Sequence, residues 1–388
     1  MVALISGRIM KRLNWNRPRA WMIFKTFVRN ISNDQKLNTN HVVLVSKSTD
    51  IFENLALEDW LYEKADLEKV SILLMWRNTP AIVVGLHQNP WIECNVQEAE
   101  KQMVPVVRRK SGGGTVYHDE GNLNVSFLKH RNLYNRIKNL ELVVEAISSR
   151  WNVDLSINQR DDIILDGLYK ISGTASKLGG KRTYHHFTLL SEVDTSALHQ
   201  LLHSQVIGTE SQATNSTRAQ VANLQDIIPD LNIGALMEEI AQQFLRGKGD
   251  LVTGPEYVNP IDEMKYPGVT KKMEELRSWE WIYGRTPDFS LQRMYTATIN
   301  DKPLSFSLKI KFKKGRIAEL NVSDICSWYG NWRETLEKGF QDCRYCRADV
   351  YARASSVKMD WILADVYNVT SSTFLDWTLH CLHTSLCI

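Results

Sequence analysis

Three consecutive glycines, 112–114, lie between a basic cluster at 108–110 and a strand-like alternation at 122–127, and this segment constrains the fold most strongly. Glycine has no Cβ, so backbone amides can approach a ligand closely and unusual dihedral angles cost little. In the alternation, Asn122, Asn124 and Ser126 would share one face of a strand. A triple glycine alone is more often a flexible turn. The flanking cations and polar series instead predict a loop that binds an anionic or strongly polar ligand.

Strand-like and helical patterns interleave along the chain. Apolar runs at 42–45, 72–76, 81–85 and 103–107 alternate with helical spacing at 51–62, 140–151 and 231–245. This order predicts a mixed α/β (α+β) class, and the length favours two domains. Glycines and prolines interrupt 250–275, and two paired strands are expected at 294–299 and 304–312. We therefore predict a catalytic domain at 40–255, a linker at 256–275 and a small C-terminal α+β accessory domain at 276–388.

Positive charge is concentrated at the N-terminus. The formal net charge is +3, but residues 1–33 carry seven basic side chains and no acidic one. Without these, 40 basic residues stand against 44 acidic ones, a net of −4, which argues against nucleic-acid binding. Residues 1–30 mix arginines with aromatic residues and are predicted to be a mitochondrial transit peptide, which implies a matrix location. The alternative is a basic disordered tail or a surface-binding helix.

The cysteines give no sign of a metal or disulfide framework. The six of them are irregularly spaced, which favours reduced thiols. Cys343 and Cys346 form a CxxC pair, but no second pair at zinc spacing accompanies it. No run beyond the leader reaches the roughly 18 apolar residues of a membrane-spanning helix. We therefore expect no membrane association of the mature chain and predict no zinc site.

Two further segments carry residues suited to chemistry. In KISGTASKLGGKRTYHHFTLL (170–190), Lys170, Ser172 and Thr174 alternate with Ile171 and Gly173, the period of a strand. A lysine there, near a glycine loop, suits charge that develops during transfer from an acyl phosphate, although most lysines are solvated surface residues.

In the third segment, QRDDIIL (159–165), Asp162 precedes an apolar run. It is a candidate contact for magnesium or for a ligand amide, although many such acids are only turn residues.

These strings resemble the two signature blocks of the lipoate-protein ligase A family, namely RRKSGGGTVYHDEGNLNVSF (108–127) and KISGTA with HHFTLL (170–190). The segments FENLALEDWLYE (52–63), LLMWRNTPAIVVGLHQNPWIECN (73–95) and SWEWIYG (278–284) resemble it as well. The likeness runs from about Val42 to the C-terminus, and motifs of this combined length are specific. With its basic leader, the chain resembles the mitochondrial lipoyltransferases of that family.

The resemblance implies site residues by position. Lys170 takes the place of the family's essential lysine, which contacts the acyl-phosphate oxygens. The implied lipoyl-nucleotide-binding residues are Arg109, Ser111, Gly112, Gly113, Gly114, Val116, His118, Asn122, Asp162, Ser172, Thr174 and Ala175. The implied lipoyl-tail pocket comprises Asn54, Leu55 and Trp76.

Three positions depart from the family pattern. The family often has Arg where Leu86 stands, Asn where Asp161 stands and Gly where Phe187 stands. A lost cation and an added acid both oppose binding of ATP, because its triphosphate is strongly anionic. Transfer from a preactivated donor is therefore favoured over full ligation.

The family fold is a mixed, twisted sheet packed by helices, as in biotin and lipoate ligases. The implied activity is acyl transfer: an acceptor lysine attacks lipoyl-AMP, another lipoyl-nucleotide or a lipoylated carrier protein, without a tightly bound cofactor. The implied acceptors are 2-oxoacid dehydrogenase E2 subunits and the glycine cleavage H protein. The alternatives are a complete ATP-dependent lipoate ligase, a biotin-protein ligase and a non-enzymatic binder of lipoyl domains. The HH-x-TLL block disfavours biotin ligases, and Lys170 disfavours a pure binder.

Overall fold

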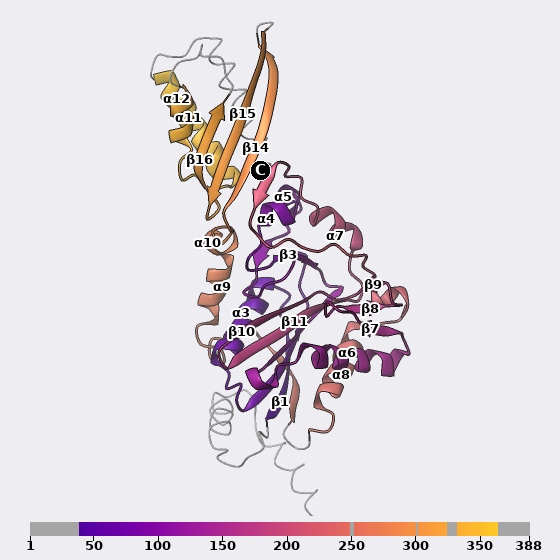
Figure 1. Ribbon diagram of the computed structural model, residues 1–388. Helices are drawn as coiled ribbons and strands as arrows, with labels where there is room; N and C mark the ends of the chain where they lie inside the picture. Colours follow the sequence, from indigo (N-terminus) through magenta and orange to yellow (C-terminus); the bar gives the residue numbers. More distant parts are fainter. Residues whose placement is uncertain (1–38, 249–251, 300–301, 324–331, 364–388) are drawn as a thin grey trace, which may run out of the picture.

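A six-stranded sheet forms the centre of the computed structural model, which describes residues 39–248, 252–299, 302–323 and 332–363 (Figure 1). Its strands, in spatial order, are β10 (Thr174–Gly179), β11 (Arg182–Leu190), β6 (Asn122–His130), β2 (Val70–Trp76), β1 (Asn40–Ser46) and β13 (Val252–Val258). β1 runs parallel to both β2 and β13, whereas the other neighbouring pairs are antiparallel.

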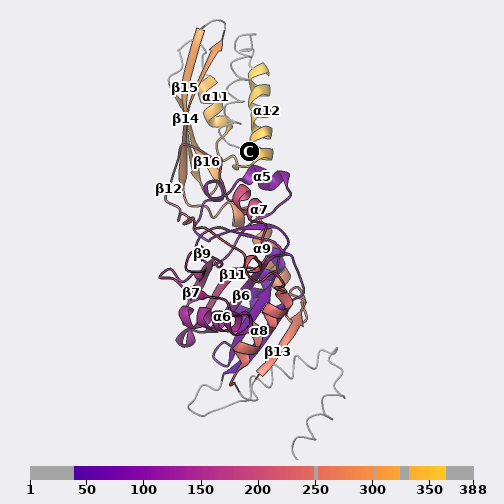
Figure 2. The same cartoon turned by 90° about the vertical axis from the view of Figure 1, so that its right-hand side faces the viewer.

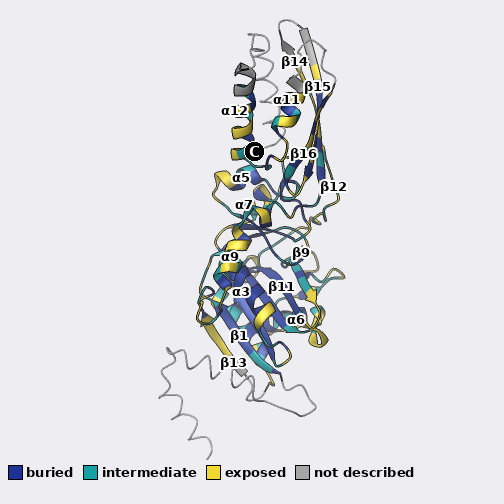
Figure 3. Ribbon diagram, turned by 90° about the vertical axis from the view of Figure 1, so that its left-hand side faces the viewer, coloured by how far each residue is buried: buried dark blue, intermediate teal, exposed yellow. Residues whose placement is uncertain are grey.

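Helices cover both faces of this sheet, which explains why β1 and β2 are unbroken apolar runs. Val42 and Leu44 join a core with α3 (Ile51–Lys64) and α9 (Val269–Arg277). The alternate residues Val43 and Val45 join a second core with α6 (Arg136–Trp151) and α8 (Ile233–Leu245). Figure 3 shows the inner strands buried, while β13 at the sheet edge is mostly exposed.

Side-chain caps fix where these helices begin. Asp50 accepts hydrogen bonds from the amides of Phe52 and Glu53 at the start of α3. Asn135 and Asn232 cap α6 and α8 in the same way. Such caps satisfy amides that have no partner within the helix.

A small sheet carries the glycine loop, and a second body lies at the end of the molecule opposite β13 (Figure 2). The small sheet consists of β4 (Val106–Arg108), β3 (Ala81–Val84) and β5 (Val116–His118). The C-terminal sheet has the order β12 (Thr209–Ser211), β14 (Phe289–Ile299), β15 (Lys302–Lys313) and β16 (Arg316–Ser323), and α11 (Trp332–Gly339) and α12 (Arg347–Leu363) pack against it. The remaining sheet is β7 (Leu155–Ile157), β8 (Ile163–Leu165) and β9 (Tyr169–Lys170), and the remaining short helices are α4 (Pro90–Glu93), α5 (Val96–Lys101), α7 (Thr195–Leu201) and α10 (Trp279–Ile282).

The predicted mixed class is confirmed, and three local expectations differ from the structure. The stretch 256–275, expected as a linker, contains the end of β13 and most of α9, and its Tyr266 and Val269 are buried in a core. β12 comes from within 40–255 but pairs with β14 of the C-terminal sheet. Lys170 to Thr174 is not one strand: β9 ends at Lys170 and pairs with β8, whereas β10 begins at Thr174 and pairs with β11. The chain passes between two sheets at this point.

One buried guanidinium ties the small sheet to the start of the C-terminal body. Arg108 is 0% exposed. It donates to the carbonyls of Gly85, Leu86 and Gln88 at 3.0, 3.0 and 2.8 Å. It also donates to Ile282 O at 2.7 Å and Thr286 Oγ1 at 3.0 Å. Burial lowers its pKa to about 10, so the group stays charged and needs all of these acceptors.

We predict that Arg108→Lys lowers the free energy of unfolding by about 2–4 kcal/mol, because an ammonium cannot reach five acceptors that a planar guanidinium serves. Denaturant unfolding followed by tryptophan fluorescence measures this change. Arg285→Lys is the control, since exposed Arg285 only stacks over Trp281. Equal midpoints for Arg108→Lys and the parent chain would contradict the assigned role.

Candidate active site

One cavity gathers most of the residues that the sequence singled out. It opens between the glycine loop, β5, β6, the start of β10 and β11. The predicted residues that line it are Leu55, Trp76, Arg109, Gly113, Gly114, Val116, His118, Asp162, Lys170, Thr174 and Ala175. Leu55 and Trp76 give it an apolar wall, to which Val116 and Ala175 add, and Arg109, His118, Asp162, Lys170 and Thr174 supply polar side chains.

The shape of the glycine loop is imposed by Arg109. Its guanidinium donates to Gly112 O at 2.6 Å, Gly114 O at 2.7 Å and Val83 O at 2.9 Å. Gly113 has φ +85°, and a Cβ on it would lie 3.0 Å from Arg109 Nη2. A residue other than glycine is therefore excluded there by both dihedral angle and space. Because its hydrogen bonds go to loop carbonyls, Arg109 acts mainly as the support of the loop.

A hydrogen-bond chain continues from Arg109. Its Nε donates to Ser111 Oγ at 3.0 Å, and Ser111 Oγ lies 2.8 Å from His186 Nε2. His186 Nδ1 lies 2.9 Å from a carboxylate oxygen of Glu58 on α3. A guanidinium only donates, so Ser111 accepts from Arg109, and a carboxylate only accepts, so His186 donates to Glu58. The loop is thus anchored to α3 through β11.

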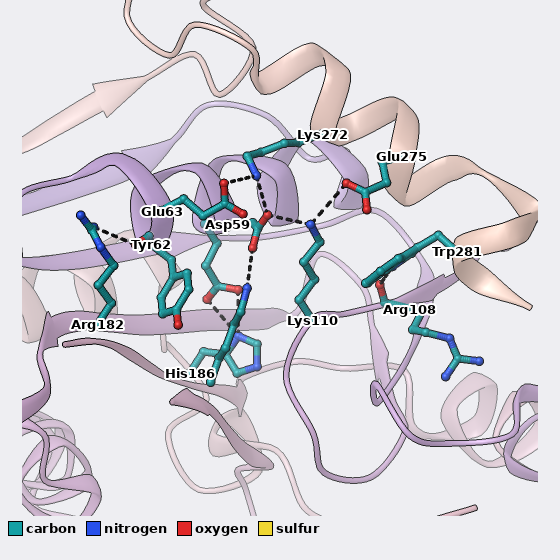
Figure 4. A network of polar contacts seen from close by, with 12 residues as sticks. Asp59, Tyr62, Glu63, Arg108, Lys110, Arg182, His186, Lys272, Glu275 and Trp281 are labelled. Carbon is teal, nitrogen blue, oxygen red and sulfur yellow. Dashed lines mark hydrogen bonds and ion pairs between the residues drawn. The ribbon is translucent and has the colours of Figure 1, made fainter. Parts of the chain in front are cut away.

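A charged cluster beside this chain anchors the same loop from outside (Figure 4). Asp59 on α3 pairs with Lys110 at 2.9 Å, Lys177 at 2.8 Å and Lys272 at 2.9 Å. Burial alone would raise the pKa of Asp59, but Lys177 and Lys110 outweigh it and lower the pKa to about 2. Because these lysines come from the glycine segment, β10 and α9, one carboxylate joins three parts of the chain.

Lys170 lies at the opposite wall of the cavity. Its Nζ pairs with Asp162 Oδ1 at 2.8 Å, and its side chain is 24% exposed. Backbone hydrogen bonds to Gln220 and Ala222 hold this residue between β8 and the 220–222 segment. The ammonium group is therefore fixed at the cavity wall, and Asp162 orients it.

His118 presents a hydrogen-bond donor to the cavity. Asn54 Nδ2 donates to two backbone carbonyls and to Asn78 Oδ1, so Asn78 Nδ2 must donate to His118 Nδ1, 2.9 Å away. Burial lowers the pKa of His118 to about 3, which keeps the ring neutral with its single hydrogen on Nε2. Among the described residues this nitrogen has no partner. It is therefore available to a ligand.

Five residues expected to contact ligand are not among those that line the cavity. Ser111 is engaged by Arg109 and His186, and the Nδ2 of Asn54 donates to carbonyls and to Asn78. Ser172 is buried and its hydroxyl accepts from Ile163 N at 2.7 Å, because the strand expected through it is broken. Gly112 and Asn122 do not line the cavity either. Contact between these five residues and ligand therefore stays a prediction.

Residues that were not among the predicted ligand contacts complete the cavity. They are Val83, Thr115, Asn124, Arg136, Arg160, Gly173, His186, Phe187, Thr188, Ser216 and Thr217. Asn124 belongs to the polar face predicted for β6, so its place was implicit in the alternation. The hydroxyl of Ser216 accepts a hydrogen bond from Thr115 N at 2.9 Å. The two residues are far apart in the sequence, and Ser216 belongs to no recognised motif.

Asp162 is a poor fit for the magnesium contact that the sequence suggested. Magnesium takes several oxygen ligands, whereas Asp162 is one carboxylate already paired with Lys170. Within the ranges that the structure describes, no group of three or more His, Cys, Asp or Glu side chains is placed to hold a metal. We therefore derive no step through a metal ion.

We predict that acid destabilises the fold through two buried histidines. Burial lowers the pKa of both His118 and His185 to about 3. Below pH about 6.5 these two histidines are protonated in the unfolded chain but stay neutral in the folded chain. The free energy of unfolding therefore falls by about 1.4 kcal/mol per pH unit for each histidine as the pH is lowered. Denaturant unfolding at about pH 6, 5 and 4 measures this slope. His185→Gln should make the pH dependence of the free energy of unfolding shallower, whereas His199→Gln, at an exposed position, should leave it unchanged. Equal slopes for the parent chain and both variants would contradict the prediction.

Known proteins share this architecture and its sequence. Residues 50–245 match the family model of the lipoyl protein ligase A/B catalytic domain. Human mitochondrial lipoyl amidotransferase LIPT1 is 38% identical over 318 residues, which cover 81% of this chain and 85% of the human protein. A putative lipoate-protein ligase A of Schizosaccharomyces pombe is 33% identical, covering 72% of this chain and 79% of its own.

The fold is also similar to that of solved structures. P. falciparum LipL1 in complex with lipoate has a TM-score of 0.55 at 25% identity, covering 89% of this chain and 99% of the parasite protein. No helix of the described ranges has the length and apolar character to cross a membrane. The human and mouse relatives are named mitochondrial, which confirms the predicted mitochondrial location. The predicted transit peptide, residues 1–30, lies outside the described residues. The family match over half of the chain and these identities confirm the predicted family, and the chain belongs to the lipoyl protein ligase A/B family.

Proposed function

We propose that the cavity binds lipoyl-AMP or a similar lipoyl-nucleotide and delivers its lipoyl group to a lysine of an acceptor lipoyl domain. The chain is an acyltransferase that forms a lipoyl-lysine amide. The observation that carries the proposal is the composition of one cavity, in which an apolar wall of Leu55 and Trp76 lies with a glycine loop and the Lys170 ammonium. An aliphatic acyl chain and a phosphate require these two environments together.

The reaction follows from this placement. The neutral ε-amine of the acceptor lysine attacks the acyl carbon of the donor, a C–N bond forms, the C–O bond to phosphate breaks, and the amine loses a proton. Negative charge then builds on the departing phosphate. Lys170 offsets that charge, and His118 Nε2 offers a further donor. No covalent enzyme intermediate is needed, because the amine is itself the nucleophile.

The acceptors we propose are E2 subunits of 2-oxoacid dehydrogenases and the glycine cleavage H protein. A complete ATP-dependent ligase is the second candidate. Asp161, which the sequence suggested would repel ATP, is paired with Arg136 at 3.2 Å. Its repulsion is therefore partly neutralised, and Arg160 adds positive charge to the cavity. Transfer remains favoured because the 38% identical human relative is named an amidotransferase, and Leu86 supplies no cation.

We predict that Lys170→Ala lowers turnover in transfer from lipoyl-AMP roughly a hundredfold, which is on the order of 3 kcal/mol of transition-state stabilisation. Transfer to an acceptor lipoyl domain and thermal melting are measured on one preparation. The matched control is Lys181→Ala, because the Lys181 side chain is 77% exposed and, within the described ranges, its one ion pair is with Glu68. If the two variants transferred equally fast, Lys170 would have no part in the reaction.

We also predict that the chain uses lipoyl-AMP far better than free lipoate with ATP, because nothing at Leu86 pairs with triphosphate. Pyrophosphate release and acceptor lipoylation are followed together. Release that keeps pace with lipoylation when lipoate and ATP are supplied would instead establish the complete ligase.

A further inference from the structure

A second hydrogen-bond chain reaches the cavity from behind its wall. Lys129 Nζ on β6 lies 2.6 Å from Asn139 Oδ1 on α6. Asn139 Nδ2 lies 3.2 Å from His185 Nδ1 on β11. His185 Nε2 lies 2.6 Å from Thr174 Oγ1, at the first residue of β10. Of these four residues only Thr174 lines the cavity, and Asn139 and His185 are buried.

The direction of every hydrogen bond in this chain is set at its far end. An ammonium group can only donate, so the Asn139 atom facing Lys129 must be the oxygen, and Asn139 donates to His185 Nδ1. A neutral imidazole has one N–H, which therefore lies on Nε2 and donates to Thr174. The Thr174 oxygen accepts, and among the described residues the hydroxyl has no other partner. Its own hydrogen is left for the cavity.

The charge states needed for this direction follow from burial. Burial lowers the pKa of His185 to about 3, so its ring is neutral at neutral pH. Burial, with repulsion from Lys248, lowers the pKa of Lys129 to about 8, which still leaves the amine mostly protonated there. Within the described ranges no carboxylate pairs with Lys129, whose other contact is the ring of Phe127 at 4.9 Å.

We propose that this chain makes Thr174 an obligate hydrogen-bond donor to an oxygen of the acyl donor, with Lys129, Asn139 and His185 as positioning residues. The partner is an acyl carbonyl or phosphate oxygen, since both accept and neither donates. A ligand that presents an N–H at this point would leave two hydrogens facing each other and would be rejected. The ligand's identity rests on the proposed function, but the direction of the chain does not.

Asn139→Asp reverses the chain with almost no change of shape. A carboxylate accepts from both neighbours, so His185 must carry its hydrogen on Nδ1 and accept at Nε2. Thr174 then donates to His185 and no longer to the cavity. The matched control is Asn135→Asp on the same helix, because Asn135 only caps α6 and Asp caps equally well.

The first test reads the histidine tautomer directly in the ligand-free protein at pH about 7. Nitrogen-15 NMR of the imidazole should show the Nε2–H form of His185 in the parent chain and in Asn135→Asp, and the Nδ1–H form in Asn139→Asp. A parent chain with His185 in the Nδ1–H form would overturn the proposal, whatever its activity.

The second test is a double-variant cycle in transfer from lipoyl-AMP to an acceptor lipoyl domain. Thr174→Val and Asn139→Asp should each lower kcat/KM roughly tenfold, the usual effect of one lost hydrogen bond to a charged group. The combined variant should be no slower than Thr174→Val, and Thr174→Ser should stay near the parent rate. Additive losses would show that Asn139 acts through stability instead, because coupled residues are not additive. If the parent chain transferred no lipoyl group, the proposed function would be refuted, but the tautomer test would still decide the direction of the hydrogen-bond chain.

Discussion

Two adjacent arginines hold the cavity together. Arg108 points to one side and serves five acceptors between the small sheet and the start of the C-terminal body. Arg109 points to the other side and fixes the carbonyls of the glycine loop. Neither guanidinium has a carboxylate partner in the described ranges, so backbone oxygens and hydroxyls meet their hydrogen-bonding needs. The loop amides can face a ligand because its carbonyls are already engaged.

The same principle orders the polar groups around the cavity. A group that can only donate, or only accept, lies at the end of each hydrogen-bond chain. Arg109 donates to Ser111, and Glu58 accepts from His186. Lys129 sets the direction of the chain that ends at Thr174, because burial keeps the ring of His185 neutral.

The sequence predicted helices and strands well where their buried faces produce a clear pattern of apolar residues. The apolar runs at 72–76 and 81–85 are strands, and the spacing at 51–62 is helix α3. The break between Lys170 and Thr174 was not predictable from alternation, because period two continues through a point where the chain changes sheets. The linker prediction failed for a related reason: glycines and prolines mark turns, but they do not show that Val269 is buried against α3.

Motif spacing placed Lys170, His118 and the glycine loop at one cavity, yet Arg136, Arg160 and Ser216 reach it through tertiary contacts that no local pattern encodes. We propose that this cavity transfers a preactivated lipoyl group to a protein lysine. The intact mass of an acceptor lipoyl domain, measured after incubation with the chain and lipoyl-AMP without ATP, tests this transfer. We expect one added lipoyl group on the acceptor lysine; an unmodified domain in the presence of enzyme that binds lipoyl-AMP would contradict the proposed transfer.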